Sequence, residues 1–257
     1  MGVSDVYKIV VFGNLPIATR IVEYIESVEE FELSAIVIGD RNPHNCDPWI
    51  ETPTLYEYCK QKGLLFLDIK EFGKAFKNQK FDLGLSCRFN KLISSEIITL
   101  FKNGIINMHG GLLPEFGGLY SCNHTILSES KIGGGTLHYI DEGIDTGDII
   151  RRCEFTLDEN DTGYSVFQKT QLALEKNMKE IIPLAVKEKI NIDQKQFNKI
   201  THNYYDKNSI ENLKQVDFHT MDGEKIDRII RAFDFPGYEP AYYFDDKNRK
   251  VYLKYTY

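Results

Sequence analysis

A chain of 257 residues is long enough to bury one substantial core and carry a small appended unit, but it is short for two full domains. Hydrophobic residues make up 42% and charged residues 27%, which is the range of ordinary globular proteins and excludes an intrinsically disordered chain. The formal net charge of -7 disfavours a sequence-independent nucleic-acid binder, because phosphate contacts need clustered Lys and Arg.

The predicted elements of the first half alternate between strands and helices. In chain order we expect a strand, then a helix, at 8–12 and 16–24; a strand and a helix at 34–38 and 54–62; strands at 64–67 and 81–86; a helix at 94–101; and a strand at 104–108. This alternation predicts a doubly wound α/β fold with a mostly parallel sheet. Ligands bind beyond the carboxyl ends of such strands, so the residues after Ser86 and Met108 are favoured site positions.

The second half predicts two further strands, a long helix and a tail. The strands at 136–140 and 148–152 are joined by the tight segment 141–147, and the helix covers about 162–187. Residues 190 to 210 are polar and poorly periodic, which indicates a boundary between a catalytic domain (1–190) and a small α+β module (191–257). The last unit of that module begins with Asp222 as a helix N-cap, followed by a helix at 224–232 and an aromatic-rich β-hairpin.

Cellular context is also predicted from the sequence. No apolar run is long enough to cross a bilayer, and Met1 to Asp5 lack the start of a signal peptide, so we expect a soluble cytoplasmic protein. The five cysteines are irregularly spaced without a C-x-x-C pair, which favours reduced structural thiols. The histidines other than His109, among them His138, show no metal-ligand spacing and are interpreted as mostly structural.

A polar pair stands at the end of the apolar strand at 104–108. Asn107 and His109 are two residues apart and therefore share one face of the strand, beside the flexible pair Gly110 and Gly111. The alternative interpretation is a capped strand end with a satisfied core histidine. A carboxylate from the segment after residue 140 can approach His109 in the fold, but the residue pattern does not choose among its four acids: Asp141, Glu142, Asp145 and Asp148.

Two motifs carry a family resemblance. The stretch NMHGGLLPEFGG, followed some thirty residues later by IDEGIDTGDII, resembles the folate-dependent formyltransferases, over roughly residues 8 to 185. The resemblance implies that Asn107, His109 and Asp145 form the catalytic set and that 10-formyltetrahydrofolate is the formyl donor. In such chemistry an amide donor stabilises the oxyanion, an imidazole accepts or relays the amine proton, and a carboxylate orients the imidazole. It requires no metal.

The resemblance places the folate site between two loops. One follows the strand at 81–86 and the other is the acidic segment, which together give the expected contacts Arg88, Phe89, Lys91, Leu92, Ile93, Asp141, Glu142 and Gly143. The alternatives are a solvated loop for Arg88 and Lys91 and core positions for Leu92 and Ile93.

The tail points to the acceptor. Its segment KIDRIIRAFDFPGYEPAYY resembles the C-terminal region of sugar-nucleotide N-formyltransferases, which implies a dTDP-linked 3- or 4-amino-dideoxyhexose of the kind used in bacterial surface glycans. The expected acceptor contacts are Gly110, Gly111, Tyr120, Asn123, Phe235 and Tyr238, with the last two stacking on the base. Alternatively, these aromatics form a core or a homodimer contact.

The sequence also departs from the family pattern. Gly111 stands where a serine is expected, and Glu115 and Gly117 stand where basic residues are frequent, which affects the expected diphosphate contacts. Two rival activities stay open, a glycinamide ribonucleotide-type formyltransferase and a formyltetrahydrofolate hydrolase, and so does a folate-binding module without enzymatic activity.

Overall fold

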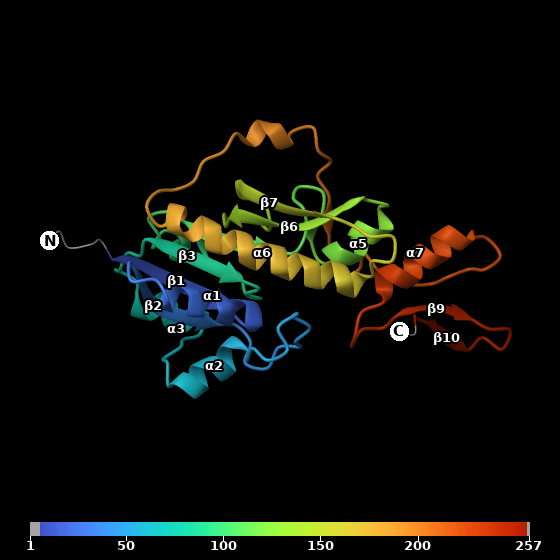
Figure 1. Cartoon of the computed structure of the whole chain (residues 1–257), viewed down its shortest axis with the longest axis horizontal. Helices are drawn as coiled ribbons and strands as arrows, with labels where there is room; N and C mark the ends of the chain where they lie inside the picture. Colours follow the sequence, from blue (N-terminus) through green and yellow to red (C-terminus); the bar gives the residue numbers. More distant parts are fainter. Residues whose placement is uncertain (1–5, 256–257) are drawn as a thin grey trace.

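A six-stranded sheet forms the centre of the computed structural model, which describes residues 6 to 255 (Figure 1). Its strand order is β2-β1-β3-β4-β6-β7, and the first four strands of that order are parallel while β6 and β7 are antiparallel. The strands are β1 (Tyr7–Gly13), β2 (Phe31–Ile38), β3 (Leu83–Cys87), β4 (Ile105–His109), β6 (Ile132–Tyr139) and β7 (Ile149–Thr156). The predicted doubly wound, mostly parallel α/β fold is confirmed.

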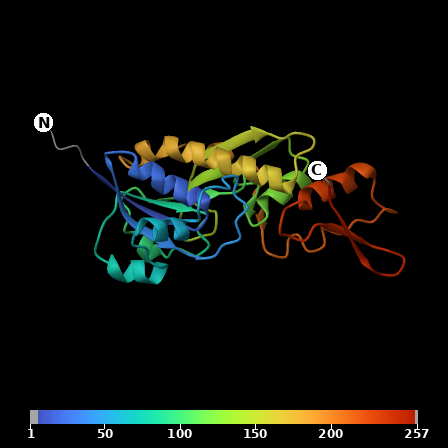
Figure 2. The same ribbon diagram turned by 60° about the horizontal axis from the view of Figure 1, so that its bottom comes forward.

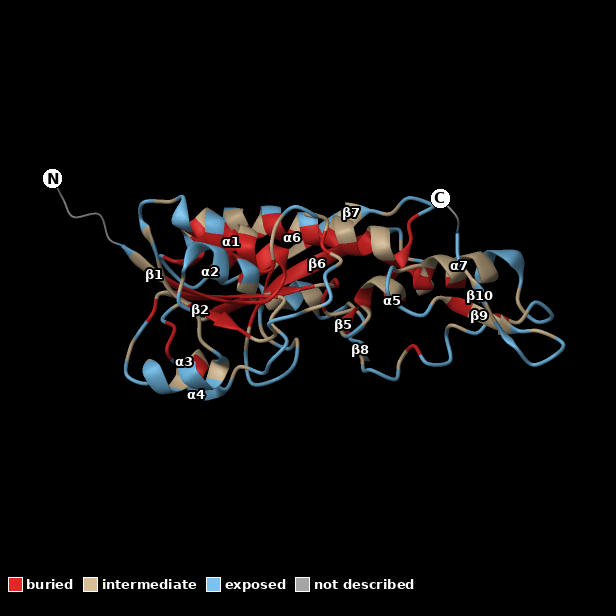
Figure 3. Cartoon of the chain, turned by 90° about the horizontal axis from the view of Figure 1, so that it is seen from below, coloured by how far each residue is buried: buried red, intermediate tan, exposed pale blue. Residues whose placement is uncertain are grey.

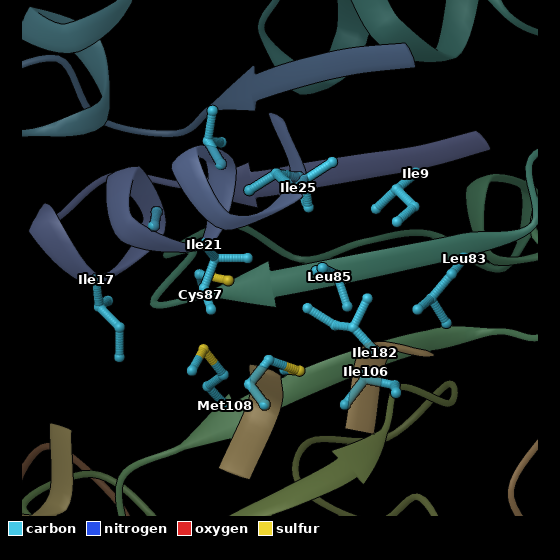
Figure 4. Packing of buried hydrophobic residues seen from close by; sticks show 14 of the residues in the cluster. Ile9, Ile17, Ile21, Ile25, Leu83, Leu85, Cys87, Ile106, Met108 and Ile182 are labelled. Carbon is cyan, nitrogen blue, oxygen red and sulfur yellow. The ribbon is translucent and has the colours of Figure 1, made fainter. Parts of the chain in front are cut away.

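Helices cover both faces of this sheet (Figure 3). On one face, α1 (Pro16–Glu26), α2 (Leu55–Lys62) and α6 (Gly163–Ala185) contribute to one large core. Figure 4 shows part of it, with Ile17 and Ile21 of α1 and Ile182 of α6 among the strand residues. On the other face, α3 (Ile69–Ala75) and α4 (Ser95–Ile98) cover a smaller core that contains Phe12 and Phe81.

Three local predictions differ from the structure. The expected strand at 64–67 is reduced to a single bridge between Val37 and Leu67, because the chain turns at once into α3, whose Asp68 forms a capping box with Glu71. The helix α5 (Ser121–Leu127) was not predicted. It is short, and its N-cap Tyr120 has a left-handed backbone and forms no side-chain cap, so the usual start signal is missing. The predicted helix at 94–101 is one short turn.

The C-terminal residues lie at one end of the elongated molecule (Figures 1 and 2). Helix α7 (Gly223–Phe233) and the hairpin of β9 (Ala241–Phe244) and β10 (Lys250–Leu253) form this end, whereas the 3-10 helix η1 (Gln194–Phe197) and β8 (Tyr204–Tyr205), which precede them, lie beside the sheet. A third core joins α7 and β9 to residues of α5 and α6, and β8 pairs with β5 (Gly117–Gly118). The boundary at residue 190 stays a prediction.

Within residues 6 to 255, no helix is both long enough and apolar enough to cross a membrane. The expectation about a signal peptide rests on Met1 to Asp5. These residues lie outside the described part of the chain. All five cysteines are free thiols.

Candidate active site

The polar pair predicted from the sequence stands at the carboxyl end of β4. Asn107 and His109 belong to a strand that lies between β3 and β6 in the sheet, and Asn107 is opposite Ser86 on one side and His138 on the other. The Asn107 amide is held from both sides: its Oδ1 accepts a hydrogen bond from Ser86 Oγ at 2.8 Å, and its Nδ2 lies 3.0 Å from His138 Nε2. Three neighbouring strands therefore fix one amide group.

The acidic segment after β6 brings one carboxylate to this pair. Asp145 has a φ of 56°, a left-handed conformation that Asp adopts more readily than most residues. Asp141 is used differently, because its Oδ1 accepts hydrogen bonds from Gly143 N and Thr146 Oγ1 and so holds the turn. Of the four acids that the sequence leaves open, Asp145 alone reaches the histidines in the described structure.

His109 is buried against Asp145. Its Nδ1 lies 3.4 Å from Asp145 Oδ2, and its Nε2 lies 2.8 Å from the carbonyl oxygen of Phe116. Because a carbonyl only accepts, Nε2 must carry the donated proton, and Nδ1 is the ring atom that can gain or lose one. A proton on Nδ1 then faces the carboxylate. The backbone N–H of Gly118 donates to the same Asp145 Oδ2 at 2.8 Å and helps to fix its position.

His138 is a site residue that the sequence interpretation missed. Its Nδ1 lies 2.8 Å from the Tyr139 carbonyl oxygen, and its Nε2 lies 3.0 Å from Asn107 Nδ2 and 3.7 Å from Asp145 Oδ1. Burial, reinforced by the nearby His109, lowers the pKa of His138 to about 4. The neutral ring therefore donates through Nδ1 and accepts through Nε2. The feature that could have indicated this role is the position of His138 on β6, directly opposite Asn107 of β4.

The loop between β4 and α5 is anchored by an ion pair. The Arg152 guanidinium on β7 forms two hydrogen bonds with the Glu115 carboxylate, at 2.5 and 2.9 Å, and also donates to the Leu113 carbonyl oxygen. Glu115, which stands where basic residues were expected, thus holds the loop that presents the Phe116 carbonyl to His109. A side chain at Gly111 would meet the Phe116 carbonyl oxygen at 2.6 Å, so close packing explains the glycine.

A cavity of about 470 Å³ opens beside this cluster. Asn107, His138 and Asp145 line it, and His109, which does not line it, contacts Asp145. Leu92 and Ile144 contribute large apolar side chains that are 81% and 52% exposed, which is typical of a ligand-binding rim. Seven of the eight predicted folate contacts line the cavity: Phe89, Lys91, Leu92, Ile93, Asp141, Glu142 and Gly143. A second cavity of about 480 Å³ shares Ile144 and Asp145 and is walled by residues 194 to 204.

Arg88, the eighth predicted folate contact, points elsewhere. Its left-handed backbone, with a φ of 55°, turns the side chain toward α6, where the guanidinium carbon lies 4.8 Å from the centre of the Phe167 ring. Its carbonyl oxygen accepts a hydrogen bond from Asn14 Nδ2. The cavity lining does not include Arg88. Sequence position alone could not show this change of direction.

Among the predicted acceptor residues, Gly110 has an open backbone, whereas Tyr120 and Asn123 pack between elements. Gly110 directly follows His109, and a side chain added there would meet no atom within 4 Å, so this backbone is open to a ligand. Tyr120 packs against the third core, and the Asn123 amide donates to the Ala232 carbonyl oxygen, which ties α5 to α7. These two side chains therefore contribute to packing between elements.

Phe235 and Tyr238 form an aromatic group at the amino end of α6. The Phe235 ring lies 5.3 Å from Tyr164, 5.4 Å from Phe167 and 5.2 Å from Tyr238, each in an edge-on arrangement. Tyr164, Phe235 and Tyr238 line a cavity of about 720 Å³. Because Phe167 touches both Phe235 and Arg88, the aromatic group borders the polar loop after β3.

No group of three or more His, Cys, Asp or Glu residues in the described chain is arranged to hold a metal ion. His124 has a packing role. Its ring stacks on that of Tyr205, with 3.6 Å between the ring centres, and its Nε2 lies 3.0 Å from Ser209 Oγ. The structural interpretation fits His124, whereas His138 holds Asn107 and also lines the cavity.

Residues 61 to 185 match the family model described as formyl transferase. A curated relative, the bifunctional polymyxin resistance protein ArnA of Wigglesworthia glossinidia brevipalpis, is 31% identical over 172 residues, which cover 65% of this chain and 25% of that protein. Methionyl-tRNA formyltransferases also match. The aligned parts span between a quarter and about half of the length of these relatives.

Solved structures resemble the whole chain. A 4-N formyltransferase from Francisella tularensis superposes with a TM-score of 0.75 and 23% identity, covering 97% of both chains. An N-formyltransferase from Helicobacter canadensis, in complex with folinic acid and dTDP-3-aminofucose, gives a TM-score of 0.70 and 22% identity over 94% of this chain and 85% of that chain. At these identities the similarity shows a shared fold.

Proposed function

This chain carries a formyl transferase domain in residues 61 to 185, and from that premise we propose that it moves a formyl group from 10-formyltetrahydrofolate to the amine of a nucleotide-linked amino-dideoxyhexose. The observation that carries the proposal is the convergence of Asn107, His138 and Asp145 on the wall of one cavity, with His109 Nδ1 3.4 Å from Asp145 Oδ2. The sugar and its dTDP carrier are supported by the likeness in fold to the complex with dTDP-3-aminofucose.

The cavity beside Asn107 suits the folate donor. Its wall combines the exposed apolar side chains of Leu92 and Ile144 with polar backbone along residues 141 to 145. A flat heteroaromatic ring needs apolar faces and hydrogen-bonding groups along its edge, and this lining offers both. The fit supports a pterin in this cavity, with the formyl group toward Asn107.

In the proposed mechanism, Asn107 stabilises the charge that develops on the formyl oxygen as the amine attacks. His138 accepts one N–H of the Asn107 amide and Ser86 donates to its oxygen, so the second N–H is held ready for the oxyanion. Such a fixed donor lowers the barrier by about 3 to 4 kcal/mol, because no reorganisation is needed during the reaction.

Asp145 and His109 manage the proton that the attacking amine loses. Asp145 lines the cavity, and His109 Nδ1, 3.4 Å from Asp145 Oδ2, can take up the amine proton while the carboxylate stabilises the resulting imidazolium. As the bond between the formyl carbon and N10 of the folate breaks, the imidazolium returns this proton to N10, so that tetrahydrofolate leaves and the neutral histidine is restored. Because the Phe116 carbonyl holds Nε2, the ring cannot rotate away from Asp145.

We also propose that the aromatic cavity lined by Phe235 and Tyr238 binds the nucleotide base, since both rings offer faces for stacking.

Free thiols at all five cysteines agree with a reducing compartment such as the cytoplasm. The exposed aromatic side chains of the hairpin, Phe244 and Tyr252, favour a homodimer. We place the reaction in the synthesis of surface glycans such as O-antigen and lipopolysaccharide.

The proposal is tested by incubating the protein with 10-formyltetrahydrofolate and a panel of acceptors, followed by mass spectrometry. The panel contains dTDP-linked 3-amino and 4-amino hexoses, the same sugars without the nucleotide, and glycinamide ribonucleotide. We expect formylation of a nucleotide-linked sugar. Formylation of glycinamide ribonucleotide alone, or formate release without an amine, would replace the proposal by one of the two rival activities.

A further inference from the structure

A cavity that the proposed function does not use adjoins the proposed folate site. It has a volume of about 780 Å³ and lies between α3 and residues 92 to 100. Leu92, whose side chain is largely exposed, lines both this cavity and the one beside Asn107. The two cavities therefore adjoin at one exposed apolar side chain.

Three lysines line the cavity beside α3. Lys70 and Lys74 are one turn apart on that helix, Lys77 follows its end, and all three residues are exposed. Phe72 of the same helix is fully buried in the core, so packing against the sheet leaves the lysines at the surface. We call this cavity, with Lys70, Lys74 and Lys77 in its wall, the lysine groove.

Nearby carboxylates do little to neutralise these charges. Asp68 and Glu71, at the start of α3, accept backbone hydrogen bonds in its capping box. Of the described residues that line the groove, Glu96 alone is acidic. Within the described chain none of the three lysines forms a salt bridge, unlike Lys102, which pairs with Asp82. Like charges this close repel one another, so the arrangement favours an anionic ligand.

The other cavity that adjoins the folate site has the opposite charge. It has a volume of about 480 Å³, shares Ile144 and Asp145 with the folate site, and adds the carboxylate of Asp148. Its described lining residues include no Lys or Arg. An extended anionic chain that leaves the folate site would be repelled there and attracted by the lysine groove. The charges therefore favour the lysine groove as the exit for such a chain.

A folate has a chemical form that fits this arrangement. Its pterin and aminobenzoyl rings are followed by a glutamate, and further glutamates can be joined through their γ-carboxyl groups. Each added glutamate contributes one more carboxylate, so the tail is a flexible polyanion. With the pterin beside Asn107, Leu92 offers an apolar surface to the aminobenzoyl ring, and the lysine groove, which Leu92 also lines, offers ammonium groups to the carboxylates.

We propose that the lysine groove binds the γ-linked glutamate tail of the formyl donor, so that this chain prefers polyglutamylated folate to the monoglutamate. The inference rests on the proposed function, since the donor is taken to be a folate bound beside Asn107. It adds Lys70, Lys74 and Lys77 to the donor site and gives α3 a role in the selection of the donor.

The test measures folate binding in the absence of an acceptor. Calorimetry gives the Kd of 5-formyltetrahydrofolate carrying one, three or five γ-linked glutamates. The wild type is compared with a groove variant that combines Lys70→Gln, Lys74→Gln and Lys77→Gln. The matched variant, which removes the same charge from exposed lysines that line neither cavity, combines Lys60→Gln, Lys176→Gln and Lys207→Gln. Melting curves check that both variants fold.

We expect the wild type to bind the triglutamate about fivefold to tenfold more tightly than the monoglutamate, because each of the two added carboxylates gains an exposed ion pair. The pentaglutamate should bind at least as tightly as the triglutamate. This preference should weaken as the salt concentration rises, disappear in the groove variant and persist in the matched variant. If the groove variant does not fold, Lys74→Glu carries the comparison, and it should weaken the preference more than Lys74→Gln.

Two results would overturn the inference. One is equal affinity of the wild type for the monoglutamate and the triglutamate. The other is an equal loss of the preference in the matched variant, which would assign the preference to net charge. In both cases the monoglutamate still binds, and the proposed donor site stands. If the wild type binds none of the three folates, the proposed function itself fails.

Discussion

At the scale of single residues, the site contains side chains that line the cavity and side chains that hold them in place. Asn107 and Asp145 line the cavity, whereas His109 contacts Asp145 and His138, which also lines the cavity, holds the Asn107 amide. The direction of each hydrogen bond follows from the carbonyl groups of Phe116 and Tyr139, which can only accept. The protonated nitrogen of each ring is therefore fixed by its backbone partner.

Replacing Asp145 or His109 tests the proton-transfer pair. We expect Asp145→Asn and His109→Asn to lower turnover at least about a hundredfold, because the amine proton loses its acceptor. Turnover is compared with that of Asp148→Asn, a change in another acid of the same segment that should leave the rate near normal. Rates close to the wild-type value in the Asp145 variant would reject the assignment.

His138 is predicted to position Asn107. His138→Phe removes the acceptor of the Asn107 N–H, so we expect kcat to fall about tenfold to a hundredfold while the KM values for donor and acceptor change little. Ser86→Ala removes the opposite contact and should have the same type of effect but a smaller one. A large rise in KM with an unchanged kcat would indicate a binding role instead.

The catalytic set could be identified from the sequence only in part. Alternation along a strand placed Asn107 and His109 on one face, and the structure agrees. Asp145 was selected through the family resemblance, because four acids in one turn are equivalent in pattern. His138 was missed, since its role depends on Asn107, which is far away in sequence and meets it only when β4 and β6 pair.

At the scale of elements, a short pairing of two strands holds the catalytic loop. Gly118 of β5 pairs with Tyr205 of β8, and its N–H binds Asp145. The segment from 190 to 205, which the sequence indicates only as a polar boundary, thus supports the active site. Sequence patterns miss such a contact because two-residue strands have no periodicity.

Gly118→Ala tests this support. Gly118 has a φ of +86°, and a Cβ there would overlap the Tyr205 carbonyl oxygen, so the β5–β8 pair must separate and release Asp145. We expect a strong loss of kcat. The control is Gly63→Ala, which has a similar φ of +68° but no atom within 4 Å of the added carbon, and which should cost only about 1 kcal/mol of stability. Equal activity of the two variants would contradict a role for this pairing.

At the scale of the whole molecule, the tail is joined to the catalytic part by a shared core. Phe233 and Ala241 pack with Ile126 of α5 and Val166 of α6. The sequence predicts the helix and the hairpin of this tail from their periodicity and turn residues, and both are present. It could not predict that α5, a helix without a side-chain cap, would form the other half of that core.

Buried histidines make the stability of the fold depend on pH. Burial lowers the pKa of both His124 and His138 to about 4. Between about pH 6.5 and pH 4 the unfolded chain therefore binds more protons at these positions than the folded one, so the free energy of unfolding falls as the pH falls through this window. Melting temperatures measured from pH 7 to pH 4 should decrease steeply for the wild type and less steeply for His124→Gln. His219→Asn, which changes an exposed histidine, should keep the wild-type slope. Parallel slopes for wild type and His124→Gln would contradict this explanation.

The central claim is that the formyl group is held at Asn107, in front of the pair formed by Asp145 and His109. A crystal structure of the Asp145→Asn variant with 10-formyltetrahydrofolate tests it most directly, because the donor should accumulate without transfer. We expect the pterin in the cavity lined by Leu92 and Ile144, with the formyl oxygen within hydrogen-bonding distance of Asn107 Nδ2. A folate bound elsewhere, or a formyl oxygen facing away from Asn107, would contradict it.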